Sequence, residues 1–147
     1  MLSKRQYQIL NSCANGWELF YFPFAEVNYG GQVFPRSAGP DCLRYEDEGP
    51  WSIHCSGRGI ADGIVALLQE GLLRVARVSE SGRHDELSAD QLGPSEFAVY
   101  NGYSCLTWQE HLRLLGYGPH EFTITETGLS EIQKREYHRY DAELGHI

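Results

Sequence analysis

The residues of this chain best suited to hold a metal ion are its cysteines and histidines. His54 and Cys55 are adjacent, whereas Cys13, Cys42 and Cys105 lie well apart in the sequence. Zinc sites usually contain paired ligands separated by about two to four residues, and no two cysteines here have that spacing. Because free cysteines are among the most buried residue types, we interpret these thiols as structural. The sequence therefore predicts no metal site and no cofactor.

A cysteine–histidine pair could also supply a nucleophile and its base. Cys55 or Cys105 could meet any of several histidines, since catalytic partners need not be close in sequence. The histidines considered are His54, His84, His111 and His120. No local signature singles out one pair, so we predict that the protein is not an enzyme. A small Cys/His-dependent enzyme stays open as an alternative.

A glycine-rich stretch, Gly57-Arg-Gly-Ile-Ala-Asp-Gly63, precedes a predicted helix. Such a turn can bind phosphate through backbone N–H groups and the positive end of the helix. Gly57, Arg58 and Gly59 are thus candidate anion-binding residues, as in a phosphate-handling enzyme. A dinucleotide-binding fold needs repeated βαβ units, and only one strand–helix–strand piece is evident here. The favoured interpretation is that the glycines allow tight packing at the start of the helix.

The chain is acidic, with twenty Asp and Glu against twelve Lys and Arg, for a net charge of −8. This charge repels nucleic acid and anionic membrane surfaces, and it suits a partner with a basic surface. Two stretches, 41–50 and 79–96, concentrate the acidic residues. The predicted partner-binding residues are Glu46, Asp47, Glu48, Asp85, Glu86 and Asp90. The alternative is that these stretches are solubilising loops.

Length and composition indicate one ordinary globular domain over residues 1–147. Hydrophobic residues make up 41% and charged residues 22%, which excludes disordered, collagen-like and coiled-coil chains. The first residues lack the apolar run of a signal peptide, and the apolar run 60–68 is too short to span a membrane. We therefore expect a cytoplasmic protein with reduced thiols.

The N-terminal half of the sequence contains few clear secondary-structure elements that could position the candidate residues. Ser3 and Gln6 have the spacing of a capping box, which predicts a helix over 4–14. Aromatic residues alternate along 17–29, which predicts a strand that ends or lies at an edge near Pro23. Whether the aromatic cluster at 17–24 is core or interface stays open.

A long irregular segment is expected over 30–59, with a short strand near 51–55. The clearest local pattern follows it: apolar residues at helical spacing predict a buried helix over 60–72 that ends near Gly71. Alternation over 72–78 predicts a strand.

The C-terminal half is predicted in shorter pieces. The polar stretch 79–95 is expected to be a loop. The remaining expected elements are a strand at 97–100 with a turn at Asn101-Gly102, a short helix at 107–116, a strand at 121–125 and a helix at 129–143.

Two segments together resemble a winged helix-turn-helix domain. The first, Ile60-Ala-Asp-Gly-Ile-Val-Ala-Leu-Leu-Gln-Glu-Gly-Leu-Leu-Arg-Val75, is similar to the third helix and first wing strand. The second, Phe122-Thr-Ile-Thr-Glu-Thr-Gly-Leu-Ser-Glu-Ile132, is similar to the second wing strand and a closing helix. The resemblance implies an α+β fold with a winged-helix-like core and an insertion at about 79–118.

The helix in the recognition position contains Asp62 and Glu70 and is preceded by Arg58, whereas helices that read DNA normally offer cations and amides. We therefore predict a non-catalytic protein–protein interaction module, of an inhibitor or immunity type, that binds a basic surface. A winged-helix DNA-binding regulator is the alternative. Arg58, Arg74 and Arg77 on one continuous face would favour that regulator. The sequence predicts no oligomeric state.

Overall fold

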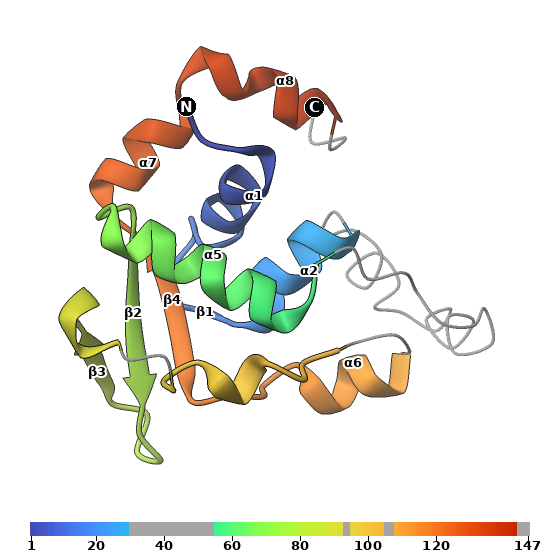
Figure 1. Cartoon of the computed structure of the whole chain (residues 1–147), viewed down its shortest axis with the longest axis vertical. Helices are drawn as coiled ribbons and strands as arrows, with labels where there is room; N and C mark the ends of the chain where they lie inside the picture. Colours follow the sequence, from blue (N-terminus) through green and yellow to red (C-terminus); the bar gives the residue numbers. More distant parts are fainter. Residues whose placement is uncertain (30–54, 93–94, 105–107, 144–147) are drawn as a thin grey trace.

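The computed structural model describes residues 1–29, 55–92, 95–104 and 108–143. These residues form a mixed arrangement of α-helices and one four-stranded antiparallel sheet, with strand order β1-β4-β2-β3 (Figure 1). The strands are β1 (Glu18–Leu19), β2 (Leu73–Val78), β3 (His84–Leu87) and β4 (His120–Ile124). The helices are α1 (Lys4–Ser12), α2 (Tyr21–Tyr29), α5 (Gly57–Gln69), α6 (Trp108–Leu114), α7 (Glu126–Ile132) and α8 (His138–Glu143). Short 3-10 helices are η2 (Ala89–Gln91), η3 (Ala98–Tyr100) and η4 (Arg135–Tyr137).

The first helix, α1, begins as its sequence predicts. The Ser3 hydroxyl accepts a hydrogen bond from the Gln6 amide, and the Gln6 side chain accepts one from the Ser3 amide, which completes the capping box. Ile9 and Leu10 are fully buried, where α1 packs against α2 and α5. Residue 12, rather than 14, ends the helix.

The predicted strand over 17–29 is wrong for most of its length. Only Glu18–Leu19 pairs as a strand, and Tyr21–Tyr29 is helix α2. Pro23 lies in the first turn, where backbone N–H groups have no intrahelical partner, so the ring costs the helix nothing. Phe20 and Phe24, four residues apart, are fully buried, whereas Phe22 is 38% exposed. Most of the aromatic cluster is therefore core.

Helix α5 and strand β2 confirm the predicted helix and strand at 60–78. The Ser56 hydroxyl caps α5 by accepting from the Gly59 amide, so the helix begins at Gly57, three residues earlier than expected. At the other end Gly71 has φ +75°, and the amides of Gly71 and Leu72 donate to the carbonyls of Leu68 and Leu67. These are the two bonds of a Schellman motif.

Strand β2 is the centre of the sheet. It pairs with β4 in the register Leu73↔Ile124 and Val75↔Phe122, and with β3 in the register Val75↔Leu87. Val75 and Phe122 are fully buried on the face that packs against α5 and the rest of the core. The prediction of a strand at 121–125 is confirmed within one residue.

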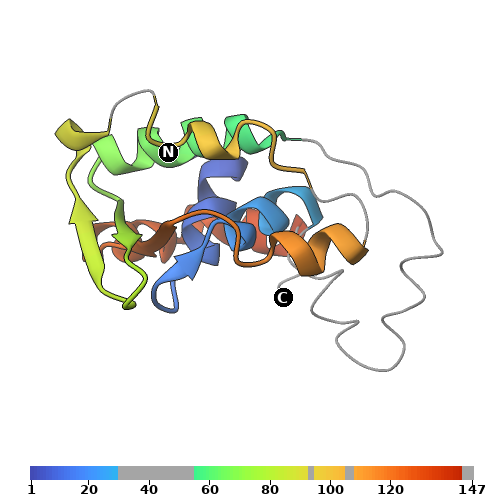
Figure 2. The same ribbon diagram turned by 90° about the horizontal axis from the view of Figure 1, so that it is seen from below.

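The segment between β2 and β4, called the insertion below, contains elements that differ from those expected. The stretch 79–95 contains β3 and η2 rather than a loop alone, and 97–100 is not a strand. Phe97 and Tyr100 are buried while the two residues between them are exposed, which is the spacing of a helical turn and not of a strand. Figure 2 shows the β2–β3 hairpin at the opposite end of the molecule from α6.

The predicted C-terminal helix at 129–143 is divided into α7, η4 and α8. Thr125 caps α7 by accepting from the Gly128 amide, and the chain turns at Lys134, whose backbone is extended. This break lets Tyr137 and Tyr140 reach Tyr7, with ring centroids 5.5 and 5.6 Å from that ring. Burial of these aromatic rings stabilises the divided form.

The irregular segment over 30–54, including most of the strand expected near 51–55, lies outside the described residues. Within the described segments, no helix has both the length and the apolar character needed to cross a membrane.

Candidate functional site

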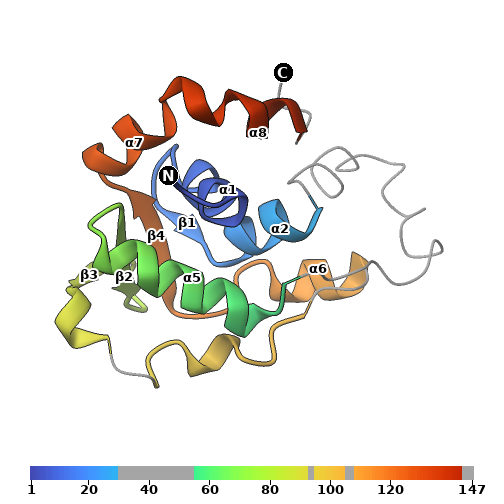
Figure 3. The same ribbon diagram turned by 45° about the horizontal axis from the view of Figure 1, so that its top comes forward.

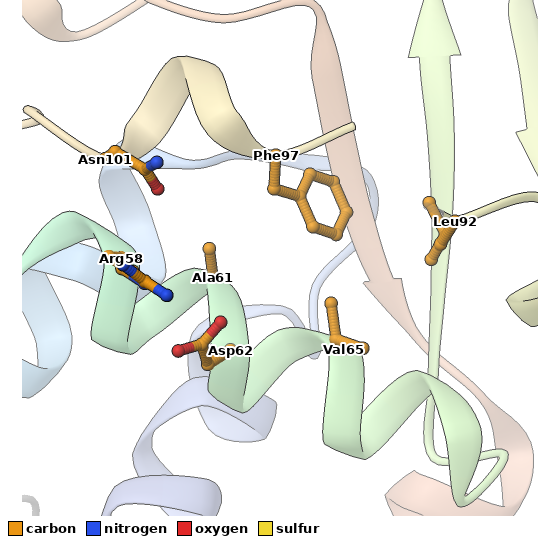
Figure 4. Close-up of a pocket in the computed structure, with 7 residues that line it drawn as sticks. All are labelled: Arg58, Ala61, Asp62, Val65, Leu92, Phe97 and Asn101. Carbon is orange, nitrogen blue, oxygen red and sulfur yellow. The ribbon is translucent and has the colours of Figure 1, made fainter. Parts of the chain in front are cut away.

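A pocket of about 390 Å³ lies where the insertion meets α5. Its size is within the range of ordinary ligand sites. Figure 3 shows the segment that carries η3 running beside α5. The pocket is lined by Arg58, Ala61, Asp62, Val65, Leu92, Phe97 and Asn101 (Figure 4).

Helical periodicity explains why α5 supplies one wall. Arg58 and Asp62 are four residues apart, so they lie one above the other on one side of the helix, and Ala61 and Val65 share that side. Figure 4 shows Arg58 and Asp62 beside each other, with Asn101 opposite them. The pocket lining therefore has a polar part, called the mouth below (Arg58, Asp62 and Asn101), and an apolar wall (Ala61, Val65, Leu92 and Phe97).

The polar side chains of the mouth have no partner elsewhere in the described part of the chain. Neither Arg58 nor Asp62 makes a side-chain hydrogen bond or ion pair there, and the Asn101 amide group makes none either. A guanidinium, a carboxylate and an amide are thus available together beside an apolar surface. Such a set suits a ligand that carries both polar and apolar groups.

A network of hydrogen bonds holds the insertion, which forms the second wall of the pocket, against strand β4. His120, on β4, is 1% exposed, and its Nδ1 lies 2.9 Å from the Tyr100 hydroxyl oxygen. Its Nε2 lies 2.8 Å from Oε1 of Glu96, and Arg77 donates to both oxygens of Glu96. Phe97, the pocket residue next to Glu96, packs edge-on against the His120 ring.

The surroundings of each side chain in this hydrogen-bonded network set its charge. The hydrogen bond from Arg77 lowers the pKa of Glu96, so Glu96 is an ionised acceptor. His120 then donates to Glu96 through Nε2 and accepts from the Tyr100 hydroxyl through Nδ1. Burial lowers the pKa of His120 and outweighs the opposing effect of Glu96, so the imidazole is neutral at pH 7. Burial also raises the pKa of Tyr100.

The candidate anion-binding residues are placed together, but two of the three are packed against other groups. A Cβ on Gly57 would collide with the Tyr100 carbonyl oxygen and with Cβ of Tyr103, and one on Gly59 would lie 2.8 Å from Sγ of Cys55. These glycines allow close approach of neighbouring segments, which favours the packing interpretation. Arg58 is exposed and lines the pocket.

The predicted partner-binding residues of the insertion are not gathered in one acidic patch. Asp85 and Glu86 are consecutive on β3, so their side chains point to opposite faces of the sheet. Asp85 pairs with Arg83, and Glu86 accepts two hydrogen bonds from Arg74 at 2.6 and 2.8 Å. Asp90 lies in η2, and residues 46–48 lie outside the described part.

The arginines considered for a DNA-binding face are also separated. Arg74 lies on the opposite face of β2 from Val75, and its guanidinium lies 5.3 Å from the centroid of the Trp17 ring. Arg77 is three residues further along β2, on the other face, and is bound to Glu96. Arg74 and Arg77 therefore do not share one continuous face with Arg58 on α5.

The cysteines and histidines considered for chemistry are dispersed. Cys13 and Cys55 are free and buried; burial raises the pKa of Cys13 to about 12 and also raises the pKa of Cys55. His84 lies against Trp17, and no hydrogen bond in the described part of the chain joins a histidine to Cys13 or Cys55. The described residues contain no group of three or more side chains placed to bind a metal ion. Cys42, His54 and Cys105 lie outside the described part, as does the side chain of His111.

Sequence reasoning missed the insertion's contribution to the pocket. Asn101 was expected only as part of a turn, and Leu92 and Phe97 had no assigned role. The structure confirms that Asn101 lies in a turn. It also places this turn beside α5, which the sequence did not indicate. Comparison of the chain with family models, with curated proteins and with solved structures found no significant match.

Proposed function

We propose that the protein is a non-catalytic protein–protein interaction module on a winged-helix-like core, and that a partner protein docks at the pocket between α5 and the insertion. The observation that carries the proposal is the pocket's composition. Arg58, Asp62 and Asn101 have no partner in the described part of the chain, and they border an apolar wall. Interface centres combine an apolar anchor site with a few polar groups in this way.

The order of the described elements supports the winged-helix-like core. With the insertion set aside, the chain runs α1, β1, α2, α5, β2 and β4, and β4 lies between β1 and β2 in the sheet. A winged helix-turn-helix domain has the same order of helices and strands. In this reading α2 is the second helix, which the sequence did not reveal.

The surface of α5 disfavours the DNA-binding alternative. Its exposed charged residues are Arg58, Asp62 and the adjacent Glu70, so the helix offers one cation against two anions. The insertion also lies along one side of this helix (Figure 3). A reading helix needs a free surface and groups that bind phosphates and base edges.

The thiols and the buried histidine support a role without catalysis. Cys13 and Cys55 are protonated at neutral pH because burial raises the pKa of each thiol. Both ring nitrogens of His120 are occupied by Tyr100 and Glu96. The groups at the pocket mouth are a guanidinium, a carboxylate and an amide. These groups bind and orient a partner more readily than they act as nucleophiles.

The net charge of −8 favours a partner with a basic surface, because opposite net charge speeds the encounter of two proteins. An inhibitor or immunity-type protein that covers a basic partner is the form of module that this charge suits. We place it in the cytoplasm, where free thiols such as Cys13 and Cys55 stay reduced.

The proposal is tested with two matched variants of the tagged full chain. Val65→Glu introduces a charge into the pocket wall, and Gln69→Glu adds the same charge one turn further along α5, outside the pocket. We expect the partner that copurifies with the unaltered chain to fall by at least about tenfold with Val65→Glu, since an unpaired charge resists burial. Gln69→Glu should retain it, and thermal melts should show both variants folded.

Equal recovery with the two variants would contradict docking at the pocket. Titration with duplex DNA at moderate salt provides the second measurement. We expect no binding in the micromolar range, because phosphate contacts supply most non-specific affinity. Tight binding that weakens with salt would favour the regulator.

A further inference from the structure

We propose that the pocket binds the C-terminal residue of the partner chain: an apolar residue with a free α-carboxylate, preceded by a lysine or arginine. This inference rests on the proposed function and names the chemistry of the docked segment. It follows from the distribution of charge around the mouth, where Arg58 lies closer to the start of α5 than Asp62 does.

Arg58 is the group that selects a carboxylate. It lies in the first turn of a thirteen-residue helix, where the helix dipole favours a negative charge. A guanidinium binds a carboxylate through two parallel hydrogen bonds, and this one has no carboxylate partner in the described part of the chain. In a C-terminal residue the α-carboxylate and the side chain branch from the same carbon, so that residue can reach Arg58 and the adjoining apolar wall at once.

The apolar wall selects the side chain of the terminal residue. Ala61 and Val65 from α5 and Leu92 and Phe97 from the insertion form the apolar part of the lining of the pocket, whose whole volume is about 390 Å³. A leucine- or phenylalanine-sized side chain would bury its surface there, which is favourable by the hydrophobic effect. Figure 4 shows Phe97 and Val65 facing across this space.

Asp62 sets the residue before the terminus. Its carboxylate has no ion-pair partner in the described part of the chain, so it attracts a cation on the docked segment. A lysine or arginine at the penultimate position supplies that cation, in keeping with the acidic net charge of the chain. The Asn101 amide can both donate to and accept from the peptide group that joins the two residues.

The test uses fluorescence anisotropy with the full chain and the labelled peptide acetyl-Gly-Ala-Gly-Lys-Leu, as the free acid and as the C-terminal amide. We expect the acid to bind at least about tenfold more tightly than the amide. In Arg58→Ala this ratio should fall to about one, while the control variant Arg135→Ala, at another exposed arginine, should keep it. Replacing the peptide lysine by alanine should weaken binding to the unaltered chain and have little effect on Asp62→Ala.

Equal binding of acid and amide, or no saturable binding of either, would overturn the inference. If the acid and the amide bound equally and Val65→Glu abolished the binding of both, docking at the pocket would stand. Only the proposed recognition of the terminal carboxylate would then be wrong. If free leucine displaced the labelled acid as effectively as the unlabelled peptide does, the pocket would be a small-molecule site and the inference would fail.

Discussion

Glu96 and His120 join the insertion to the sheet through a contact of 2.8 Å between Oε1 and Nε2. They lie 24 residues apart, and Phe97, which follows Glu96, forms part of the pocket. The neutral imidazole on β4 therefore helps to position the pocket wall, together with the local hydrogen bonds of η3.

We predict that the free energy of unfolding decreases as the pH falls from 7 toward 5. Burial holds the pKa of His120 below its ordinary value of about 6.5, so the unfolded chain binds this proton first and protonation favours unfolding. The stability that the neutral imidazole contributes is fully present above the ordinary value and is lost below it. Denaturant titrations at several pH values measure the slope.

His120→Gln is the control for this dependence, because glutamine can still hydrogen-bond Glu96 and does not titrate. The slope between pH 7 and 5.5 should be smaller in this variant. The lowered pKa of Glu96 adds a further loss of stability only at lower pH, as that carboxylate becomes protonated. An equal slope in both proteins would mean that His120 does not titrate as its burial implies.

Gly57→Ala should destabilise the protein, since the new methyl group would collide with the Tyr100 carbonyl and with Tyr103. Backbone must move to admit it, and overpacking of this kind costs about 1–3 kcal/mol. Gly102→Ala is the matched control, because its Cβ would meet no atom within 4 Å. Chemical unfolding of both variants compares them, and a Gly57→Ala protein as stable as the control would argue against close packing at this helix start.

Leu68→Ala should lower the free energy of unfolding by about 2–5 kcal/mol, because the side chain is buried on the core face of α5. Gln69→Ala, at the next and exposed position, should change it by no more than about 0.5 kcal/mol. Thermal or denaturant melts provide both values. Similar midpoints for the two variants would count against the buried face assigned to this helix.

Cys13 should resist alkylation in the native protein. Burial raises its pKa to about 12 and also blocks access, so little thiolate is present to react. Peptide mapping after iodoacetamide treatment, with and without denaturant, measures labelling at this position. Rapid native labelling would show that the N-terminal core opens readily.

The elements that sequence predicts well are those fixed by nearby residues. Ser3 and Gln6 cap α1 between themselves, and Gly71 ends α5 through bonds to residues one turn away. Such signals act over a few residues and can be read without knowing the rest of the fold. The strands at 73–78 and 120–124 followed from the same local patterning.

The elements that sequence predicts poorly depend on distant contacts. Aromatic residues favour strands, and α2 becomes a helix because Phe20 and Phe24 pack together in the core, with Tyr100 stacked on Phe20 at 3.8 Å between ring centroids. The pocket has the same origin. Nothing near Asn101 in the sequence indicates that it lies opposite Arg58, because the tertiary fold brings α5 and the insertion together.

Docking at the α5 pocket is tested most directly by photo-cross-linking from Asn101. A benzoylphenylalanine placed there should cross-link one partner protein, and the cross-linked peptide should be lost when Val65→Glu is added. The same photoreactive residue at Ser130, an exposed position on α7, should not capture that partner. Capture of the same protein from both positions, or a cross-link from Asn101 that survives Val65→Glu, would contradict a partner site in this pocket.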